Sequence, residues 1–577
     1  MKQTFRPFIP AVFSLGLLLM SSSVLAQSLP ESALSTAEPG RAFEQFKEES
    51  LTRPFSPVIQ IEDAMTDAAP ANANHVKLKL SALNLKGVSV YTEADLNHLY
   101  GAKLGQTVSL KDVYDIARQL KLKYRNDGYL LAQVVVPPQT IENGLVELQV
   151  VEGVIDSVTI QGEESASTDL IRRYADQLAK GQALNARDLE RQLLLINDLP
   201  GISARSVLSP SPNRTGAADL RIMIERDPFD ALVGVNNYGS RYLGPLQLSA
   251  AASVNNRLFD MNERVSAQIV TAPKTANPFD YELGYIGLSY QQPIWNKGTV
   301  LEAFYGHTDT EPGFDLKQFD VRGRSNYVSL KLEHPFLRSR AQNLYGRVLF
   351  DWRDVTTANN LPEPSRHDHI RALRAGMRYD LLDTFLGVGV NAIDLELARG
   401  LGLFGASDKG DANLSRTFGD PDFFKATIAL QRLQRLSRDI NLLVSGQGQW
   451  AAQSLLASEE FGVGGMMGIG RGFDPSEIVG DDGIAGKIEL QWNRPVEWSL
   501  VQDYQVFGFF DAGHVWNGDA STSALKEETA TSAGVGLRAK VTDKVKADLT
   551  LAVPLNRKVD AQRDKDPRLY FSLSREF

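Results

Sequence analysis

Apolar and polar residues alternate along most of the chain from about Phe229 to the C-terminus. In the segment 544–553 every second residue is apolar, and most residues between them are charged or polar; the apolar set is Val545, Ala547, Leu549, Leu551 and Val553. A period of two predicts β-strands. One apolar and one polar face per strand is typical of a membrane barrel, whose outer wall meets lipid and whose lumen holds water.

Sixteen such segments follow one another in this region, and their connections also indicate a barrel. Connections after even-numbered segments are short, whereas those after odd-numbered segments are often long, as in bacterial barrels. The first connection of the long set, near 240–244, is itself short, and the longest is 452–483. The segments are 230–239, 245–257, 262–272, 280–292, 297–307, 324–336, 341–353, 366–380, 384–397, 421–434, 439–451, 484–493, 503–516, 530–541, 543–554 and 567–577.

The N-terminus has the pattern of a secretory signal peptide. Lys2 and Arg6 precede an apolar stretch, and small residues then lead to Val24-Leu25-Ala26, so we expect cleavage after Ala26. The apolar stretch is too short for a membrane-spanning helix, and no later stretch holds 18 consecutive apolar residues. A closed barrel is therefore the predicted route into a membrane, because only helices and closed barrels satisfy their backbone groups in lipid.

An internal repeat fills residues 76–227. Gly105–Asp112 recurs as Gly181–Asp188, and in each copy a cap residue (Ser109, Asn185) stands three positions before an aspartate. The cap oxygen can accept hydrogen bonds from free helix N–H groups, and the aspartate complements the helix dipole. Each copy begins with a short strand and ends with alternating strands, so we predict two α+β units of order β-α-α-β-β. One α+β domain with a chance repeat is the alternative.

Residues 27–75 carry the weakest pattern. Strong helix formers in the segment 42–49 predict a short helix with one weakly apolar side. The segment 53–75 is rich in Pro, Ala and Asn, which predicts a linker with little to bury. A loose leader is the alternative interpretation.

Composition narrows the expected partners. The net charge of −9 becomes −11 when Lys2 and Arg6 are removed, and an acidic chain argues against nucleic acid as a partner. The absence of cysteine excludes disulfides, thiolate zinc sites and thiol nucleophiles. His367-Asp368-His369 is the one dense group that could bind a metal, but no third ligand is evident, so we interpret it as polar lumen or rim. We expect no metal, no cofactor and no catalytic residues.

The long connection 452–483 holds six glycines before Phe473, and one arginine lies between two of them in Gly470-Arg471-Gly472. The spacing is not that of a nucleotide-binding loop. If alternate residues of the strand 503–516 face the lumen, Asp511 is a confined carboxylate that needs a cation. Guanidinium is the geometric match, so an Arg471–Asp511 pair is one interpretation. Two separately solvated lumen charges are the other.

The chain resembles the outer-membrane transporters of two-partner secretion, a family that exports filamentous haemagglutinins and haemolysins. The resemblance covers nearly the whole mature chain, is weak in residues 27–75, and rests on motifs in both halves of the sequence. These motifs are Gly128-Tyr129, Val136-Pro137-Pro138-Gln139 and Val151-Glu152-Gly153, then Asn236-Asn237-Tyr238-Gly239-Ser240 and Leu243-Gly244-Pro245, and finally Arg471-Gly472-Phe473 and Phe509-Phe510-Asp511-Ala512-Gly513.

The resemblance implies a signal peptide (1–26), a plug helix and linker (27–75), two small α+β polypeptide-transport-associated (POTRA) domains (76–153 and 154–228) and a transmembrane β-barrel of 16 antiparallel strands (229–577). The segment Gly40–Ser50 matches the position of the plug helix. The resemblance further implies that the loop 452–483 folds back into the pore, where Arg471 contacts Asp511. The implied transport motif is Arg471, Gly472 and Phe473, facing the barrel-wall residues Phe509, Asp511 and Gly513.

The function implied is export of a large secreted exoprotein, adhesin-like or haemolysin-like, across the outer membrane. The POTRA domains would bind the unfolded client in the periplasm by β-augmentation, and the client would thread the barrel without a nucleotide. Lipid of the outer membrane is the other expected partner. The alternatives are an outer-membrane assembly insertase, which commonly carries more POTRA domains, a passive porin, which needs no soluble repeats, and an outer-membrane enzyme.

Overall fold

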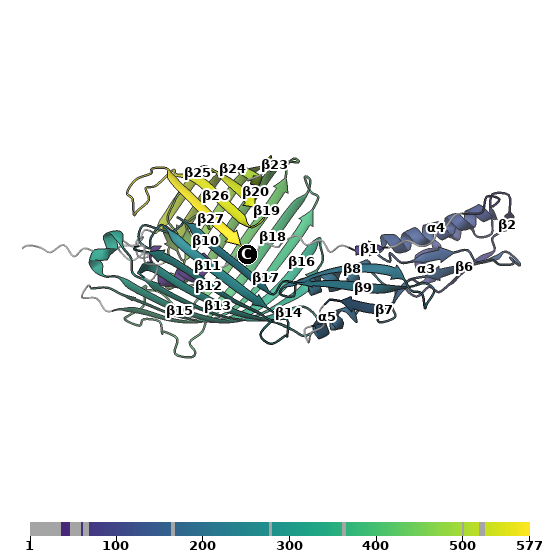
Figure 1. The fold of residues 1–577 in the computed structure, drawn as a ribbon, viewed down its shortest axis with the longest axis horizontal. Coiled ribbons are helices and arrows are strands. Elements are labelled where there is room, and N and C mark those ends of the chain that lie inside the picture. Colours follow the sequence, from purple (N-terminus) through teal and green to yellow (C-terminus); the bar gives the residue numbers. More distant parts are fainter. Residues whose placement is uncertain are drawn as a thin grey trace, which may run out of the picture.

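The protein has two parts, a wide β-barrel and two α+β units that project from one end of it (Figure 1). This computed structural model describes residues 36–46, 59–61, 69–162, 168–275, 280–360, 365–498, 501–518 and 526–577. The predicted signal peptide, 1–26, lies outside the described residues. Among the described helices, none is long and apolar enough to cross a membrane.

Sixteen strands form the closed barrel, each antiparallel to its neighbours, with the last strand β27 pairing with the first strand β10. The predicted fold class is thus confirmed, and the strand ends differ from the predicted ones by a few residues. The bounds are β10 Phe229–Asn236, β11 Gln247–Asn255, β12 Arg264–Pro273, β13 Tyr281–Ile294, β14 Thr299–Thr310, β15 Arg322–Arg338, β16 Gln342–Ala358, β17 Arg366–Asp383, β18 Gly389–Gly400, β19 Phe424–Arg435, β20 Ile440–Ala451, β23 Asp482–Trp498, β24 Val501–Trp516, β25 Glu527–Thr542, β26 Val545–Pro554 and β27 Arg568–Glu576.

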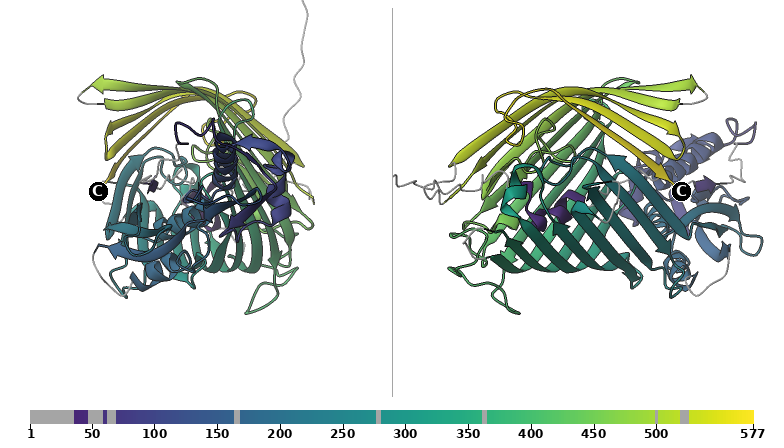
Figure 2. Two further views of the ribbon diagram at one scale, coloured as in Figure 1. Left: turned by 90° about the vertical axis from the view of Figure 1, so that its right-hand side faces the viewer. Right: turned by 60° about the vertical axis from the view of Figure 1, so that its left-hand side comes forward.

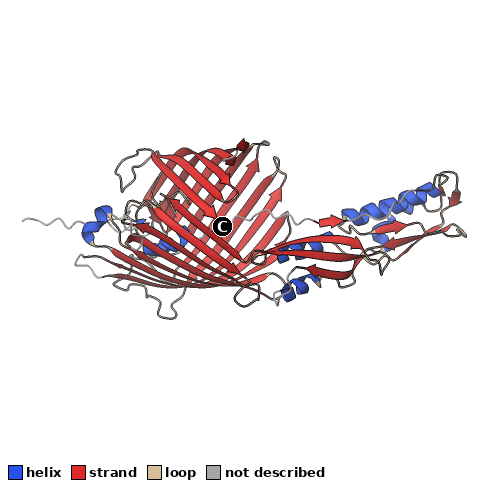
Figure 3. Cartoon of the chain, viewed as in Figure 1, coloured by secondary structure: helices blue, strands red, loops and turns tan. Residues whose placement is uncertain are grey.

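The wall of the barrel has the two faces that the alternation predicts. On β24, Phe510 points outward and is half-exposed, whereas Phe509 and Asp511 on either side of it are buried in the lumen. The outer face is apolar on β26 as well, where Leu549 and Leu551 are exposed. Short turns join the strands at the end that carries the α+β units, and longer loops lie at the far end (Figure 3).

The first α+β unit has a three-stranded sheet of order β3-β6-β5, with β3 (Ala82–Lys86) parallel to β6 (Leu145–Val151) and antiparallel β5 (Gln133–Val135) on the other edge. Its chief helix is α4 (Leu110–Asn126), which follows α3 (Glu93–Asn97) and η2 (Gly101–Lys103). A small ribbon of β2 (Lys77–Lys79) and β4 (Thr107–Ser109) precedes it. The predicted cap is confirmed: the Ser109 hydroxyl accepts from Asp112 N–H at 3.2 Å, and the Asp112 carboxylate accepts from Ser109 N–H at 2.8 Å.

The second unit repeats this order with β7 (Val154–Gln161), α5 (Thr168–Ala175), α6 (Ala186–Asn197), β8 (Ile202–Pro210) and β9 (Ala217–Arg226). The repeated glycine has the same role in both units, since Gly105 and Gly181 have φ of +79° and +74°, a left-handed conformation before each capped helix. Each unit has its own apolar core, so two units are confirmed and a chance repeat in one domain is excluded.

A fourth strand extends the sheet of the second unit. Residues Ile59–Ile61 (β1) pair in parallel with β8, so that Ile59 lies opposite Ser206 and Ile61 opposite Leu208. This segment falls within the predicted linker, where no strand was expected.

The second unit is fastened to the barrel by ion pairs at the short turns. Arg338 at the end of β15 donates two hydrogen bonds to Asp198, at 2.8 and 2.7 Å, and Arg340 in the following turn contacts Glu190 of α6 at 3.3 Å. Arg191 adds a hydrogen bond to Pro335 O at 3.1 Å. These contacts orient α6 against the barrel, and with it the rest of the unit.

Glu152, directly after β6, joins several parts of the first unit. Its carboxylate accepts from Ser89 N–H at 2.7 Å, Val90 N–H at 2.9 Å and Tyr124 O–H at 2.8 Å, and the Ser89 hydroxyl also donates to it. Burial alone would raise the pKa of Glu152, but these donors outweigh it and hold the pKa below the ordinary value.

We predict that Glu152→Gln destabilises the first unit by about 2 kcal/mol, because an amide presents N–H groups to these donors. The ionised carboxylate stabilises the unit above its unfolded pKa, and this contribution is lost as the pH falls through the lowered folded pKa. Urea unfolding of a fragment of residues 59–227 between pH 7 and pH 3 measures both effects. Glu147→Gln is the control, since Glu147 pairs with Lys86 at the surface. Equal pH dependence in wild type and Glu152→Gln would contradict the prediction.

Candidate functional site in the barrel lumen

The connection between β20 and β23 folds back along the inner wall of the barrel. It contains η4 (Ala457–Glu459) and a small antiparallel pair of strands, β21 (Phe461–Val463) and β22 (Ile478–Gly480). Residues 452–481, which we call the inner loop, pack an apolar cluster against lumen-facing residues of β23, β24 and β25. The cluster includes Val463, Ile469, Phe473, Ile478, Ala485, Val515 and Ala530.

The tip of the inner loop is held by one carboxylate on the barrel wall. Arg471 donates to Asp511 through Nε at 3.0 Å and Nη2 at 2.8 Å, so the pair has the bidentate geometry of guanidinium and carboxylate. The backbone N–H groups of Gly470 and Arg471 donate to the same carboxylate, at 3.1 and 3.0 Å. Arg471 is 4% exposed and Asp511 is fully buried, so two solvated lumen charges are excluded.

Sequence reasoning missed the second carboxylate of this network. Glu489 on β23 also contacts the Arg471 guanidinium, and Arg538 on β25 donates to Glu489 at 2.6 Å. The two guanidinium groups lie 3.6 Å from the Phe509 ring centroid and 3.8 Å from that of Phe507, respectively. Carboxylates and guanidinium groups thus alternate along this network, and each guanidinium group lies over an aromatic ring. Strand alternation puts Glu489 on the lumen face, which was the available signal.

The glycine after Arg471 is needed because the loop touches the wall there. A Cβ at Gly472 would lie 2.8 Å from Ser532 Cβ and 3.0 Å from Pro554 N, so a larger residue would push the loop away. The next residue, Phe473, is fully buried in the apolar cluster. Gly513, on the wall, leaves room for Val463, whose Cγ1 would lie 2.5 Å from an added Cβ.

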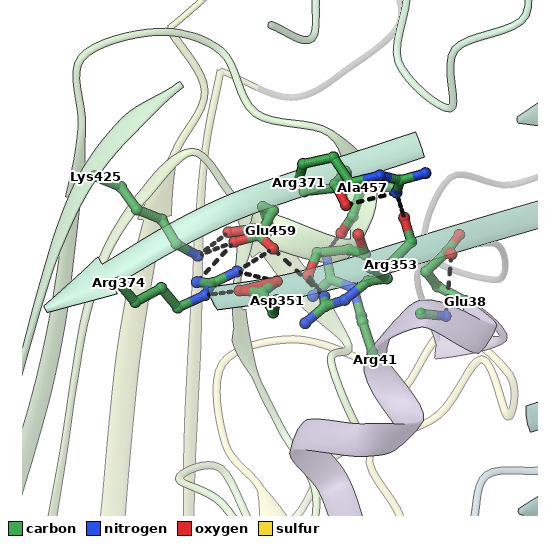
Figure 4. A network of polar contacts seen from close by, with 12 residues as sticks. Glu38, Arg41, Asp351, Arg353, Arg371, Arg374, Lys425, Ala457 and Glu459 are labelled. Carbon is green, nitrogen blue, oxygen red and sulfur yellow. Dashed lines mark hydrogen bonds and ion pairs between the residues drawn. The ribbon is translucent and has the colours of Figure 1, made fainter. Parts of the chain in front are cut away.

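Sequence reasoning also missed a second group of buried charged residues, the Glu459 cluster, which holds the inner loop (Figure 4). Glu459 reaches the barrel wall and contacts three cations, Arg374 at 2.8 Å, Lys425 at 2.8 Å and Arg353 at 3.5 Å. Arg374 also pairs with Asp351 at 2.6 Å. Glu459 is 2% exposed, so its charge depends on these partners. Its sequence signal is weak, since an acidic pair in a loop is usually solvated.

The N-terminal segment lies inside the barrel (Figure 2), next to the Glu459 cluster (Figure 4). It comprises η1 (Pro39–Arg41) and α2 (Ala42–Phe46), which cover the first part of the predicted 42–49 helix; residues 47–49 lie outside the described residues. Arg41 donates to Glu460 at 3.0 Å and to Ala457 O, so the segment rests on the inner loop. Phe46 packs on Tyr285 of β13 with ring centroids 5.1 Å apart.

The histidine group that could bind a metal is divided by the strand geometry. His369 contacts Asp354 at 2.8 Å and His367 contacts Thr356 at 3.2 Å, whereas Asp368 is buried and accepts from Ser415 N–H. Within the described residues, no three potential ligands gather around one point. The interpretation of these residues as polar lumen or rim stays a prediction.

We predict that Glu459→Gln loosens the inner loop, because Arg353, Arg374 and Lys425 lose the carboxylate that they share; breaking a buried pair costs about 3 kcal/mol. The barrel should still assemble but lose its folded band in SDS at a lower temperature, and the inner loop should become sensitive to protease. Glu302→Gln is the control, since Glu302 pairs with Lys331 on the wall at 3.1 Å, away from the loop. Equal effects in both variants would contradict a special role for Glu459.

The chain is similar in sequence to several known proteins. The family model for haemolysin secretion/activation proteins ShlB/FhaC/HecB matches residues 216–539, and that for ShlB-type POTRA domains matches residues 78–153. The heme/hemopexin transporter HuxB of Haemophilus influenzae (strain 86-028NP) is 24% identical over 560 residues, 96% of each chain.

Two solved structures of the transporter CdiB show a similar fold. The one from Escherichia coli superposes with a TM-score of 0.70 at 20% identity, covering 89% of this chain and 93% of that chain. The one from Acinetobacter baumannii gives 0.65 at 18% identity, covering 95% and 100%. At this identity the likeness concerns the fold.

Proposed function

Because this chain belongs to the haemolysin secretion/activation protein family, we propose that Arg471 and Asp511 hold the inner loop in the position from which a client is exported. The chain is an outer-membrane transporter of two-partner secretion, it works with a secreted exoprotein, and its POTRA domains lie in the periplasm. The end of the barrel that carries the α+β units therefore faces the periplasm, and the long loops face outward.

The proposed domain boundaries follow the architecture. We assign the signal peptide to 1–26, the plug segment and linker to 27–75, the two POTRA domains to 76–153 and 154–228, and the barrel to 229–577. The plug assignment is supported by the position of residues 36–46 in the lumen, where Arg41 contacts the inner loop. A client can pass only after this segment and part of the inner loop have moved.

The observation that carries the proposal is the concentration of donors on one buried carboxylate. Asp511 accepts two hydrogen bonds from the Arg471 guanidinium and two from the loop backbone. None of these bonds belongs to the strand ladder of the barrel, so the contact fixes the loop without being needed for barrel closure. Gly472 and Phe473 supply the close approach and the apolar anchor, while Phe509 and Gly513 shape the wall.

The POTRA domains offer sheet edges on which an extended client can add a strand. The edge of β8 already binds one extended segment of this chain, β1, over three residue pairs. The edges β3 and β5 of the first domain are uncovered by any strand among the described residues. We therefore propose that an adhesin-like or haemolysin-like client docks on these edges by backbone pairing, with lipid as the other partner and no nucleic acid or nucleotide.

Export needs no chemistry in this scheme, and we propose no catalytic residue. The free energy for direction would come from folding of the client outside the cell, which opposes its return. The lumen contributes a polar path whose charges are largely paired with one another.

We predict that Arg471→Ala assembles in the outer membrane but secretes poorly, because the loop loses its main tie to the wall. Asp511→Ala should behave alike, and the double variant should be no worse than either single, since all three remove the same contact. Arg471→Lys should also fail substantially, because an ammonium group cannot make the bidentate contact. Secreted client is measured against barrel abundance in the outer membrane.

Arg432→Ala is the matched control for these variants. Arg432 forms an equally bidentate pair with Asp383, at 2.7 and 3.1 Å, on the wall near the short turns and away from the inner loop. It should secrete at nearly the wild-type level. Wild-type secretion by both Arg471→Ala and Asp511→Ala would refute the proposed role of the pair.

We also predict that a fragment of residues 76–227, which lacks β1 and leaves the β8 edge open, binds the N-terminal region of the client with a Kd of about 1–10 μM, weak enough for release. A peptide of residues 57–63 in excess should compete if the β8 edge is used, whereas a scrambled peptide should not. Calorimetry measures both. A folded fragment that shows no binding would remove the POTRA domains as the docking site.

A further inference from the structure

The barrel is closed by its shortest ladder. The first strand, β10, and the last, β27, pair over five positions, from Leu232 opposite Glu576 to Asn236 opposite Ser572. Among the described strands, every other neighbouring pair in the barrel is aligned over eight positions or more. The β10–β27 seam is therefore where the barrel wall has the fewest backbone bonds.

Beyond this ladder, β27 continues without a strand on its seam side. Its residues Arg568–Phe571 still pair with β26, where Phe571 lies opposite Leu549 and Arg568 opposite Ala552. β10 ends at Asn236, so the seam-side backbone groups of this part of β27 must find other partners. Orphaned backbone groups are costly in a membrane wall, because lipid cannot replace the missing hydrogen bonds.

Asn237 supplies those partners. Its backbone N–H donates to Phe571 O at 3.2 Å, and its side-chain oxygen accepts from Phe571 N–H at 2.7 Å. Its side-chain nitrogen donates to Leu569 O at 2.9 Å. The amide side chain carries the same donor and acceptor as a peptide unit, so it extends the ladder by the equivalent of one more pair.

The surroundings support this role. Beyond Asn237 the two strands border a cavity of about 330 Å³, which is lined by Asn237, Arg241, Asp566 and Tyr570 among others. On the lumen side the next residue, Tyr238, packs edge-to-face on Tyr570 of β27 with ring centroids 6.3 Å apart. Among the described residues, Asn237 thus makes the last backbone hydrogen bond across the seam before the strands separate.

We propose that Asn237 is the positioning residue that closes the barrel at the β10–β27 seam. It belongs to the motif Asn236-Asn237-Tyr238-Gly239-Ser240, to which the transport scheme gives no role. Its neighbour Asn236 acts locally, since its side-chain oxygen accepts from Tyr238 N–H at 2.9 Å. The role of Asn237 concerns the barrel wall, so it stands independently of the inner loop and of the client.

The test compares Asn237→Ala with Asn556→Ala in the full-length protein. Asn556 makes the same two side-chain bonds, accepting from Thr531 N–H at 2.8 Å and donating to Thr529 O at 2.7 Å, but beside the ten-position ladder of β25 and β26. Asn237→Ala should lower the temperature at which the folded band is lost in SDS by about 4 °C, and Asn556→Ala by less than about 2 °C. Asn237→Gln, which keeps a donor and an acceptor on a longer side chain, should fall between wild type and Asn237→Ala.

A disulfide across the same seam distinguishes closure from general stability. A Cβ at Gly234 would lie 3.8 Å from Ser574 Cβ, the separation usual in disulfides, once the Ser249 hydroxyl rotates away from it. Since the chain has no native cysteine, the pair G234C/S574C forms a single defined link. Oxidation should restore the Asn237→Ala barrel to the temperature of the oxidised G234C/S574C protein with Asn237 intact, and reduction should abolish the rescue.

Equal losses in Asn237→Ala and Asn556→Ala, or no rescue by the oxidised link, would overturn the proposal. If Asn237→Ala fails to assemble, Asn237→Gln carries the same comparison and the same rescue. These readouts measure barrel closure and not export, so their failure would leave the proposed function standing.

Discussion

A strand in a bilayer has no water to satisfy its backbone, and this constraint shapes the rest of the molecule. It requires the sheet to close on itself, which β10 and β27 achieve through a five-pair ladder and the Asn237 amide. Once the barrel is closed, the backbone groups of its strands are satisfied by one another. The side chains that face the lumen are then available for contacts with other segments. The inner loop and the N-terminal segment are therefore held by contacts outside the strand ladder of the barrel, and they can leave the lumen while that ladder stays intact.

Buried carboxylates in the lumen are paired with cations. Asp511, Glu489 and Glu459 are each nearly or fully buried, and each lies against at least one guanidinium group. Buried pairs of this kind add little net stability compared with apolar packing, but removing one partner is costly. Such pairs suit a segment like the inner loop, which must hold one specific position and must also be able to move to another. The apolar cluster around Phe473 acts differently, because apolar burial stabilises the loop against the wall without requiring one particular geometry.

Much of the fold follows from local sequence patterns, whereas much of the site does not. Alternation is encoded residue by residue, so the barrel strands and the lumen face of Asp511 were predictable, and so were the caps Ser109 and Asn185. Glu459 and Glu489 were missed because a polar residue on the lumen side has the same local pattern whether it binds water or a guanidinium. Only the packing of the inner loop decides which of the two it meets.

The strand β1 was missed for a related reason. Ile59-Gln60-Ile61 is too short for a periodic signal, and its partner Ser206 lies far along the chain. Its pairing is parallel, so it depends on the arrangement of the second unit and not on a local turn.

The position of β1 also limits how far the lumen segment can travel. Twelve residues, 47–58, separate Phe46 in the lumen from Ile59 at the edge of β8. A chain of that length spans at most about 45 Å even when fully extended. While β1 stays paired, the segment that leaves the pore remains tethered near the mouth, at an effective concentration in the millimolar range. Resealing the pore is then an intramolecular event, whose rate does not depend on how many copies of the transporter the membrane holds.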